Sequence, residues 1–368
     1  MKRKSILIAL MLVLSLTLVA CGQGAPANNE TANNTANTEN TAEETQGGGE
    51  IAGKKIGFVT DEGGINDQSF NQGVWEGLQL AATDFGIEPS YQESNQSNDY
   101  APNLETLLDD GNEIIVAAGF NLGDAMLEAA EMNPDTQYVI VDYAYEDGPD
   151  NITGILFKQE EPSFLVGYIA GLTTETDTVG FVGGQQSTLI ETFEYGYKAG
   201  VDQAAAELGK EIKVISQYVG NFTDAAKGKS IATNMYQQGA DVVFHASGGA
   251  GDGVIEAAKE LGKWAIGVDR DQNSLAPDNV LTSAMKRADS AVYNIIESLA
   301  NGEAFPGGET IVYGLKDGDT VDIAPTSDKN VKPEILEKVQ PLKEKIIDGT
   351  IVVPASAADY EQFTPVTE

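Results

Sequence analysis

The 368-residue chain has one cysteine, Cys21, and one histidine, His245. A single thiol excludes an intramolecular disulfide, and a single imidazole leaves little material for histidine-based catalysis or a multi-histidine metal site. Cations are also scarce, since 22 Lys and Arg stand against 57 Asp and Glu, for a formal net charge of −35. Such a charge balance disfavours nucleic acid and anionic lipid surfaces, so we expect no nucleic-acid partner. Acidity alone identifies no ligand and is typical of secreted surfaces.

The first residues of the chain indicate where the protein is located. Three cations, Lys2, Arg3 and Lys4, precede an apolar run over residues 6–19, which is too short for a stable membrane span and is typical of a signal peptide. The run ends in LVACG at residues 18–22, which resembles the lipobox of a bacterial lipoprotein. The resemblance implies that residues 1–20 are removed and that Cys21 is lipidated. We therefore expect a protein anchored to the cell membrane by lipid and facing the extracytoplasmic side, with an ordinary signal peptide as the alternative.

Residues 21–50 are rich in Asn, Thr, Glu, Ala and Gly and show no apolar periodicity. A stretch of this composition cannot bury enough apolar surface to offset the entropy of ordering. We expect it to be a disordered tether. The chain that follows is long enough for two domains of ordinary size.

After Gly53, short apolar runs alternate with amphipathic stretches, which predicts a βαβ series and parallel sheets with right-handed crossovers. Two such series follow each other, with a break near residues 157–162. Strands are expected at residues 55–60, 113–118, 138–142, 178–182, 213–218, 242–245, 264–268 and 280–285. Helices are expected at residues 70–85, 122–132, 164–174, 194–208, 225–238, 253–261 and 289–301.

The two series resemble each other. Each opens with a Gly-Phe-Val strand, at residues 57–59 and 180–182, and each carries an acid at a strand end, Asp142 and Asp269. Doubly wound sheets bind ligands at the carboxyl ends of their strands. We therefore expect an α/β protein with two doubly wound parallel-sheet lobes that face each other across one cleft.

Several segments resemble one known family, the basic membrane protein family of lipoprotein solute receptors of ABC importers. The opening segment TDEGGINDQSFN at residues 60–71, followed by Trp75-Glu76-Gly77, is similar to the family's opening signature. Further matches, in chain order from about residue 53 to 360, are FLVGYIAG (164–171), GFVGG (180–184), ETFEYGYKAG (191–200), DAAKGKSI (224–231), the glycine-rich residues 248–253, GVDRDQ (267–272) and LTSAMK (281–286).

The resemblance implies a type I periplasmic-binding-protein-like fold, with two lobes joined by a three-strand hinge and a ligand held between them. The first lobe would comprise residues 53–157 with about 284–317, and the second 158–283 with about 318–368. The family's best-known members resemble a purine-nucleoside receptor. The resemblance implies a nucleoside ligand, a membrane permease as partner and no catalysis. We expect neither a cofactor nor a metal, and a monomer.

In the first half, Asp61 ends the first strand and is expected to hydrogen-bond the ligand, and Phe70 is expected to stack on its base, both by family resemblance. Asn66, like Asp67 and Ser69, suits the N-terminus of a helix and is a further candidate, with capping as the alternative. Asp142 ends a strand, where a buried acid needs a partner such as a ligand N–H or hydroxyl. Packing or capping is the alternative for these residues.

In the second half, Phe222 is our choice for the second stacking face, and Phe193 is its competitor. Asp269 is expected to accept the ribose hydroxyls, since charged acceptors form the stronger hydrogen bonds. Lys286 is expected to donate to the ribose and to neutralise Asp269, with a structural salt bridge as the alternative. Gly248 opens a glycine-rich loop that would let backbone approach the ligand. The loop lacks the last glycine of G-x-G-x-x-G, so we expect no dinucleotide.

The sequence therefore predicts a lipid-anchored receptor that closes on a purine nucleoside and passes it to a permease. Riboflavin or a pentose is an alternative ligand of the same class. A ligand-sensing adaptor and a surface nucleosidase are alternatives of other classes.

Overall fold

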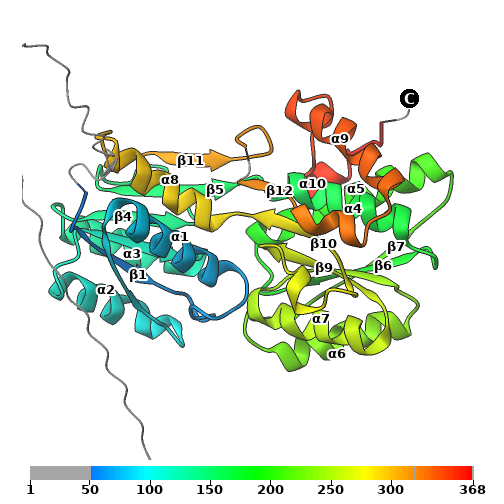
Figure 1. The fold of residues 1–368 in the computed structure, drawn as a ribbon, viewed down its shortest axis with the longest axis horizontal. Helices are drawn as coiled ribbons and strands as arrows, with labels where there is room; N and C mark the ends of the chain where they lie inside the picture. The colour runs from blue at the N-terminus through cyan, green and yellow to red at the C-terminus, as the bar shows by residue number, and fades with distance from the viewer. Residues whose placement is uncertain (1–50, 319, 367–368) are drawn as a thin grey trace, which may run out of the picture. The chain divides into compact units, whose positions relative to one another are not determined.

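Two six-stranded sheets, each covered by helices on both faces, make up residues 51–318 and 320–366, which the computed structural model describes (Figure 1). The predicted α/β architecture with two doubly wound lobes is confirmed. We call the lobe that contains the first strand the first lobe, and the other the second lobe.

The first sheet has the strand order β2-β1-β3-β4-β5-β11, and all of its pairings are parallel. Its strands are β1 (Lys55–Val59), β2 (Glu88–Gln92), β3 (Ile114–Ala118), β4 (Gln137–Val141), β5 (Ile152–Phe157) and β11 (Thr310–Tyr313). Its helices are α1 (Phe70–Phe85), α2 (Tyr100–Asp109), α3 (Gly123–Met132) and α8 (Ala288–Ala300).

The central strand β3 shows why this sheet is covered on both faces. All five of its residues are buried. Ile114 and Val116 belong to the core that α1 and α8 cover, whereas Ile115 and Ala117 belong to the core under α2 and α3. Successive side chains of a strand point to opposite faces, so an unbroken apolar run requires a helix layer on each side.

The second sheet has the order β7-β6-β8-β9-β10-β12. Its strands are parallel except for the last pair, in which β12 runs antiparallel to β10. The strands are β6 (Thr178–Gly183), β7 (Lys213–Tyr218), β8 (Val242–Ala246), β9 (Trp264–Asp269), β10 (Val280–Lys286) and β12 (Val321–Ile323). The helices are α4 (Glu160–Thr173), α5 (Thr188–Leu208), α6 (Ala225–Gln237), α7 (Gly251–Leu261), α9 (Pro333–Ile347) and the short α10 (Ala357–Tyr360).

The described chain passes between the two sheets three times: from β5 into α4, from β10 into α8, and from β11 into β12. These passages are the expected three-strand hinge. Residues 284–286, which the sequence analysis assigned to the first lobe, pair with β9 and β12 of the second sheet, so the return to the first lobe follows Lys286.

Glycines set the spacing of α4 and α5, the helix pair formed by two of the family-like segments. A Cβ added at Gly200 of α5 would lie 1.9 Å from the carbonyl oxygen of Phe164, and one at Gly167 of α4 would lie 2.2 Å from that of Tyr197. The two backbones can approach this closely only where the side chain is a hydrogen atom. These segments therefore serve helix packing.

Candidate functional site

A cavity lies where the carboxyl ends of both sets of parallel strands meet. The space between its walls is about 520 Å³, a figure that includes the part open to solvent. Eight of the nine ligand-binding residues expected from the sequence line it. These are Asp61, Phe70, Asp142, Phe193, Phe222, Gly248, Asp269 and Lys286.

The ninth candidate, Asn66, is exposed and does not belong to the cavity lining. Its loop instead contributes Asp67, together with Asn71 of α1. The Asp67 carboxylate also accepts hydrogen bonds from the backbone N–H groups of Ser69, Asn71 and Gln72, at 3.0, 2.9 and 3.0 Å. Asp67 thus caps the N-terminus of α1, where negative charge is favourable.

Asp142 and Asp269 occupy matching places in the two lobes. Asp142 directly follows β4, and Asp269 is the last residue of β9. Both have left-handed backbone conformations, with φ of 71° and 65°, and both side chains are more than 90% buried. Residues other than glycine adopt this conformation at a cost of order 1–3 kcal/mol, and such residues gather at binding sites.

Asp142 is the ion-pair partner of Lys286. The Lys286 ammonium lies 2.5 Å from Oδ2 of Asp142, and the two side chains are only 4% and 5% exposed. The sequence analysis had assigned Lys286 to Asp269, whereas the structure pairs it across the hinge with the acid of the first lobe. The other oxygen of Asp142, Oδ1, is buried and has no hydrogen-bond partner, so it is an open acceptor at the cavity.

Asp269 is paired only with a hydroxyl. The Ser69 Oγ–H of the first lobe donates to its Oδ2. Burial raises the pKa of Asp269 to about 6, an effect that the nearby Lys286 charge and the Ser69 hydrogen bond partly oppose. The raised pKa shows that the carboxylate is incompletely compensated, so an additional hydrogen-bond donor would stabilise it.

Asp61 is a further acid of the cavity wall and is held by two hydrogen bonds from its own lobe. Its Oδ1 accepts from the Gly63 backbone N–H at 2.9 Å and from the Asn71 side-chain amide at 2.7 Å. Burial nevertheless raises the pKa of Asp61 to about 6. A third acceptor with spare capacity therefore lies on the cavity wall.

Aromatic rings from both lobes line the cavity. Phe70 lies beneath the Lys286 ammonium, 4.4 Å from its ring centroid, and so forms a cation–π contact. From the second lobe, Phe193 is buried and packs on Phe244 with ring centroids 6.5 Å apart, whereas Phe222 is only partly buried. The structure thus brings both candidates for the second aromatic face to the cavity, with Phe222 the more accessible.

One aromatic residue of the cavity wall, Phe120, was not predicted from the sequence. It follows β3 and meets Phe222 edge to face, with ring centroids 6.4 Å apart and an interplanar angle of 77°. Its position two residues after the end of β3 was the signal that could have identified it. Ser247 was also missed; it follows β8, is fully buried and lines the same cavity.

Cys21 lies outside the described residues. Within residues 51–318 and 320–366, no helix combines the length and the apolar character that crossing a bilayer requires.

Comparison with known proteins identifies the family of this chain. Residues 54–357 match the model of the Bmp family, described as "ABC transporter substrate-binding protein PnrA-like". The chain belongs to this family. It is the solute-binding component of an ABC transporter and not an enzyme.

Relatives in several bacteria cover most of the chain. "ABC transporter nucleoside-binding protein BmpA" of Lactococcus lactis subsp. cremoris is 39% identical over 322 residues, which is 82% of this chain and 89% of that protein. "Basic membrane protein A" of Borreliella burgdorferi is 38% identical over 313 residues, or 84% and 90% of the two chains. Among solved structures, a solute-binding protein of an ABC transporter system from Aeropyrum pernix superposes with a TM-score of 0.76 at 26% identity, covering 84% of this chain and 96% of that one.

Proposed function

We propose that this Bmp-family protein binds purine nucleosides between its lobes and delivers them to a membrane permease. The observation that carries the proposal is the composition of the cavity wall, where accessible aromatic rings from opposite lobes stand beside buried carboxylates with spare acceptor capacity. A purine base offers a flat face to the rings, and a ribose offers hydroxyls to the acids.

In this arrangement Phe70 and Phe222 contact the two faces of the base. Each stacking contact contributes roughly 0.5–1.5 kcal/mol beyond the area it buries. Asp269 accepts hydrogen bonds from ribose hydroxyls, and the free Oδ1 of Asp142 accepts another donor of the ligand. Lys286 donates to the ribose while its charge stays balanced by Asp142.

The charge of the cavity favours an uncharged ligand. Four acids, Asp61, Asp67, Asp142 and Asp269, line it together with a single cation, Lys286. A nucleotide would bring two or more negative charges into this wall, so we expect nucleotides to bind far more weakly than nucleosides. One relative supports a nucleoside ligand, because the Lactococcus protein is named as nucleoside-binding.

Calorimetric titration tests the ligand. Guanosine, inosine, adenosine, cytidine, ribose, riboflavin and guanosine monophosphate are titrated into the same protein, and then into Phe70→Ala and Asp269→Ala. We expect tight binding of purine nucleosides that both substitutions abolish or strongly weaken. Binding of the monophosphate as tight as that of guanosine would contradict the proposal. If only ribose or riboflavin released heat, that compound would be the ligand in place of a nucleoside.

We also propose that Cys21 carries a lipid that holds the receptor at the membrane. Mass spectrometry of the N-terminal peptide and fractionation of Cys21→Ser cells test this. Release of the variant from the membrane fraction is expected.

A growth experiment separates transport from ligand sensing. If the protein were a sensing adaptor without a transport role, it would still bind nucleosides, but deletion of its gene would not impair growth on a nucleoside.

A further inference from the structure

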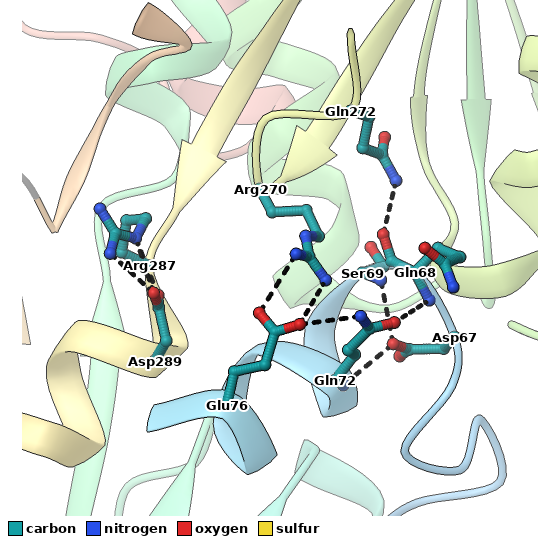
Figure 2. Close-up of polar contacts among 9 residues, drawn as sticks. All are labelled: Asp67, Gln68, Ser69, Gln72, Glu76, Arg270, Gln272, Arg287 and Asp289. Carbon is teal, nitrogen blue, oxygen red and sulfur yellow. Dashed lines mark hydrogen bonds and ion pairs between the residues drawn. The ribbon is translucent and has the colours of Figure 1, made fainter. Parts of the chain in front are cut away.

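The end of β9 and the loop that follows it reach from the second lobe to the first at three residues. Asp269 accepts the hydrogen bond of the Ser69 hydroxyl, which belongs to the ligand cavity described above. The next contacts lie outside the cavity. Arg270 and Gln272 bind the segment around the start of α1, as Figure 2 shows.

Arg270 forms a two-pronged ion pair with Glu76 of α1. Its Nη1 lies 3.2 Å from Oε1 and its Nη2 lies 3.1 Å from Oε2. The side chains are 33% and 42% exposed, so the pair is partly shielded from water. Because guanidinium and carboxylate meet in a fork, the contact fixes orientation as well as distance.

Glu76 is itself held in place from its own lobe. The Gln72 side-chain amide donates to Oε1 of Glu76 at 2.8 Å, and Gln72 Oε1 accepts from the backbone N–H of Gln68 at 3.2 Å (Figure 2). The backbone N–H of Gln72 is in turn bound by Asp67, a residue of the cavity wall. The acceptor is therefore presented to Arg270 in a fixed position.

Gln272 makes the second contact. Its Nε2 donates to the carbonyl oxygen of Gln68, a residue with a left-handed φ of 53°, at 3.0 Å. Its Oε1 accepts from the Val268 N–H at 3.0 Å and lies 2.9 Å from Nε2 of the buried His245. Gln272 is 1% exposed, so its position is set by the interior of the second lobe.

We infer that these four residues, Gln68, Glu76, Arg270 and Gln272, form an interlobe clasp that stabilises the closed receptor and slows ligand release. Glu76 and Gln272 are each held by their own lobe, so they lose little side-chain entropy when the lobes meet. None of its contacts passes through the ligand cavity. The clasp therefore sets the population of the closed form for any ligand, and affinity follows that population.

The inference deepens the proposed function, because it assigns part of the affinity to residues that do not touch the nucleoside. The position of the clasp couples it to binding, since Arg270 directly follows Asp269. A ligand that fixes the Asp269 carboxylate also fixes the start of the clasp loop.

The test measures lobe separation directly. Cys21 is the one cysteine of the chain, so the Cys21→Ser protein offers no thiol of its own for labelling. Asn98→Cys and Ala226→Cys introduce two exposed labelling sites, which follow the edge strands β2 and β7. Each of these edge strands lies at the side of its sheet that is far from the strands where the chain crosses between lobes. The distance between the labels is therefore sensitive to hinge opening. Spin labels and pulsed electron resonance report the populations of short and long distances.

The variants are Arg270→Gln, Glu76→Gln and the two together, measured without ligand and with guanosine. Glu76→Gln keeps an oxygen for the Gln72 amide, so only the ion pair is lost. The ratio of closed to open molecules should fall about two- to fivefold in each single variant, the range for a partly exposed ion pair, and no further in the double variant. Guanosine dissociation, followed by stopped flow, should accelerate by a similar factor.

The matched control is the Lys54–Glu113 ion pair, which lies within the first lobe and has side chains 35% and 53% exposed. Lys54→Gln with Glu113→Gln should change neither the distances nor the dissociation rate. The clasp would be overturned if Arg270→Gln and Glu76→Gln left the distance populations unchanged. It would also be overturned if the effect of the double variant equalled the sum of the effects of the two single variants. If neither the labelled protein nor its variants bind guanosine, the nucleoside proposal fails. The distances measured without ligand still test the clasp in that case.

Discussion

Asp269 should destabilise the folded protein at neutral pH, so its replacement by asparagine should stabilise it. The carboxyl is 7% exposed, and burial raises its pKa from 3.8 to about 6. Asparagine tolerates the left-handed backbone that this position requires, and its amide oxygen can still accept the Ser69 hydroxyl. Asp269→Asn thus removes the charge and retains the local geometry.

The sign and size follow from the pKa difference. A folded-state pKa above the unfolded value means that the folded protein binds this proton more tightly. The contribution of Asp269 to the free energy of unfolding is therefore fully present below about pH 4 and is lost as the pH rises through about 6. A shift of about two pKa units corresponds to about 3 kcal/mol, so Asp269→Asn should be more stable than the native protein by about 2–3 kcal/mol at pH 7 and equal to it near pH 4.

Urea unfolding of both proteins at several pH values between 4 and 7.5 measures this difference. Asp142→Asn provides the contrast, because Asp142 has the same residue type and the same backbone conformation but pairs with the buried Lys286. Removing that partner leaves an uncompensated ammonium, which should cost about 3–5 kcal/mol at pH 7. A stability difference for Asp269→Asn that does not grow with pH, or two variants with the same sign, would refute the reasoning.

Three further predictions concern other parts of the molecule. Gly200→Ala should destabilise the protein by several kcal/mol in thermal unfolding, because the added methyl group meets the Phe164 carbonyl oxygen, whereas Gly209→Ala, which only strains a left-handed helix end, should cost about 1 kcal/mol. His245 should be neutral, with its proton on Nε2 facing Gln272, and nitrogen NMR should show no titration between pH 5 and 8, since burial lowers its pKa to about 4. Asp269→Asn should weaken guanosine binding about 10- to 100-fold in calorimetry, the effect of losing hydrogen bonds to a charged acceptor; unchanged binding would place the ribose elsewhere.

The buried parallel strands were predictable because each is a nearly continuous apolar run. The expected strands at residues 138–142, 213–218 and 264–268 lie within one residue of β4, β7 and β9, and the first helix was predicted with its observed bounds. The edge strand β2 was missed, because its sequence EPSYQ contains a proline and alternates little. The start of α5 was placed six residues late, because the cap at Ser187, whose side chain accepts from the backbone N–H of Ile190, was not identified from the sequence.

The composition of the site was predictable for a different reason. In a parallel sheet all strands end at one edge, so the residues that follow the strands converge on that edge whatever the details of packing. This argument identified Asp61, Asp142 and Asp269 and would have identified Phe120 as well. The partner of Lys286 was not predictable, because it depends on how far the lobes close about the hinge, a distance that no local pattern encodes.

Lobe closure also explains why two acids in matching positions differ in their electrostatics. Lys286 lies on β10, the strand that leads from the second sheet into the hinge, and closure directs its ammonium to Asp142 of the opposite lobe. Asp269, at the end of the neighbouring β9, is left with a hydroxyl as its partner. Of these two carboxylates, the closed form therefore holds one that is paired with a cation and one that is paired only with a hydroxyl. A ligand with hydroxyl or N–H donors lowers the free-energy cost of burying the Asp269 carboxylate. Because this interaction is made only in the closed form, the ligand shifts the population toward that form. The acid that destabilises the fold at neutral pH is thus the acid that makes closure depend on the ligand.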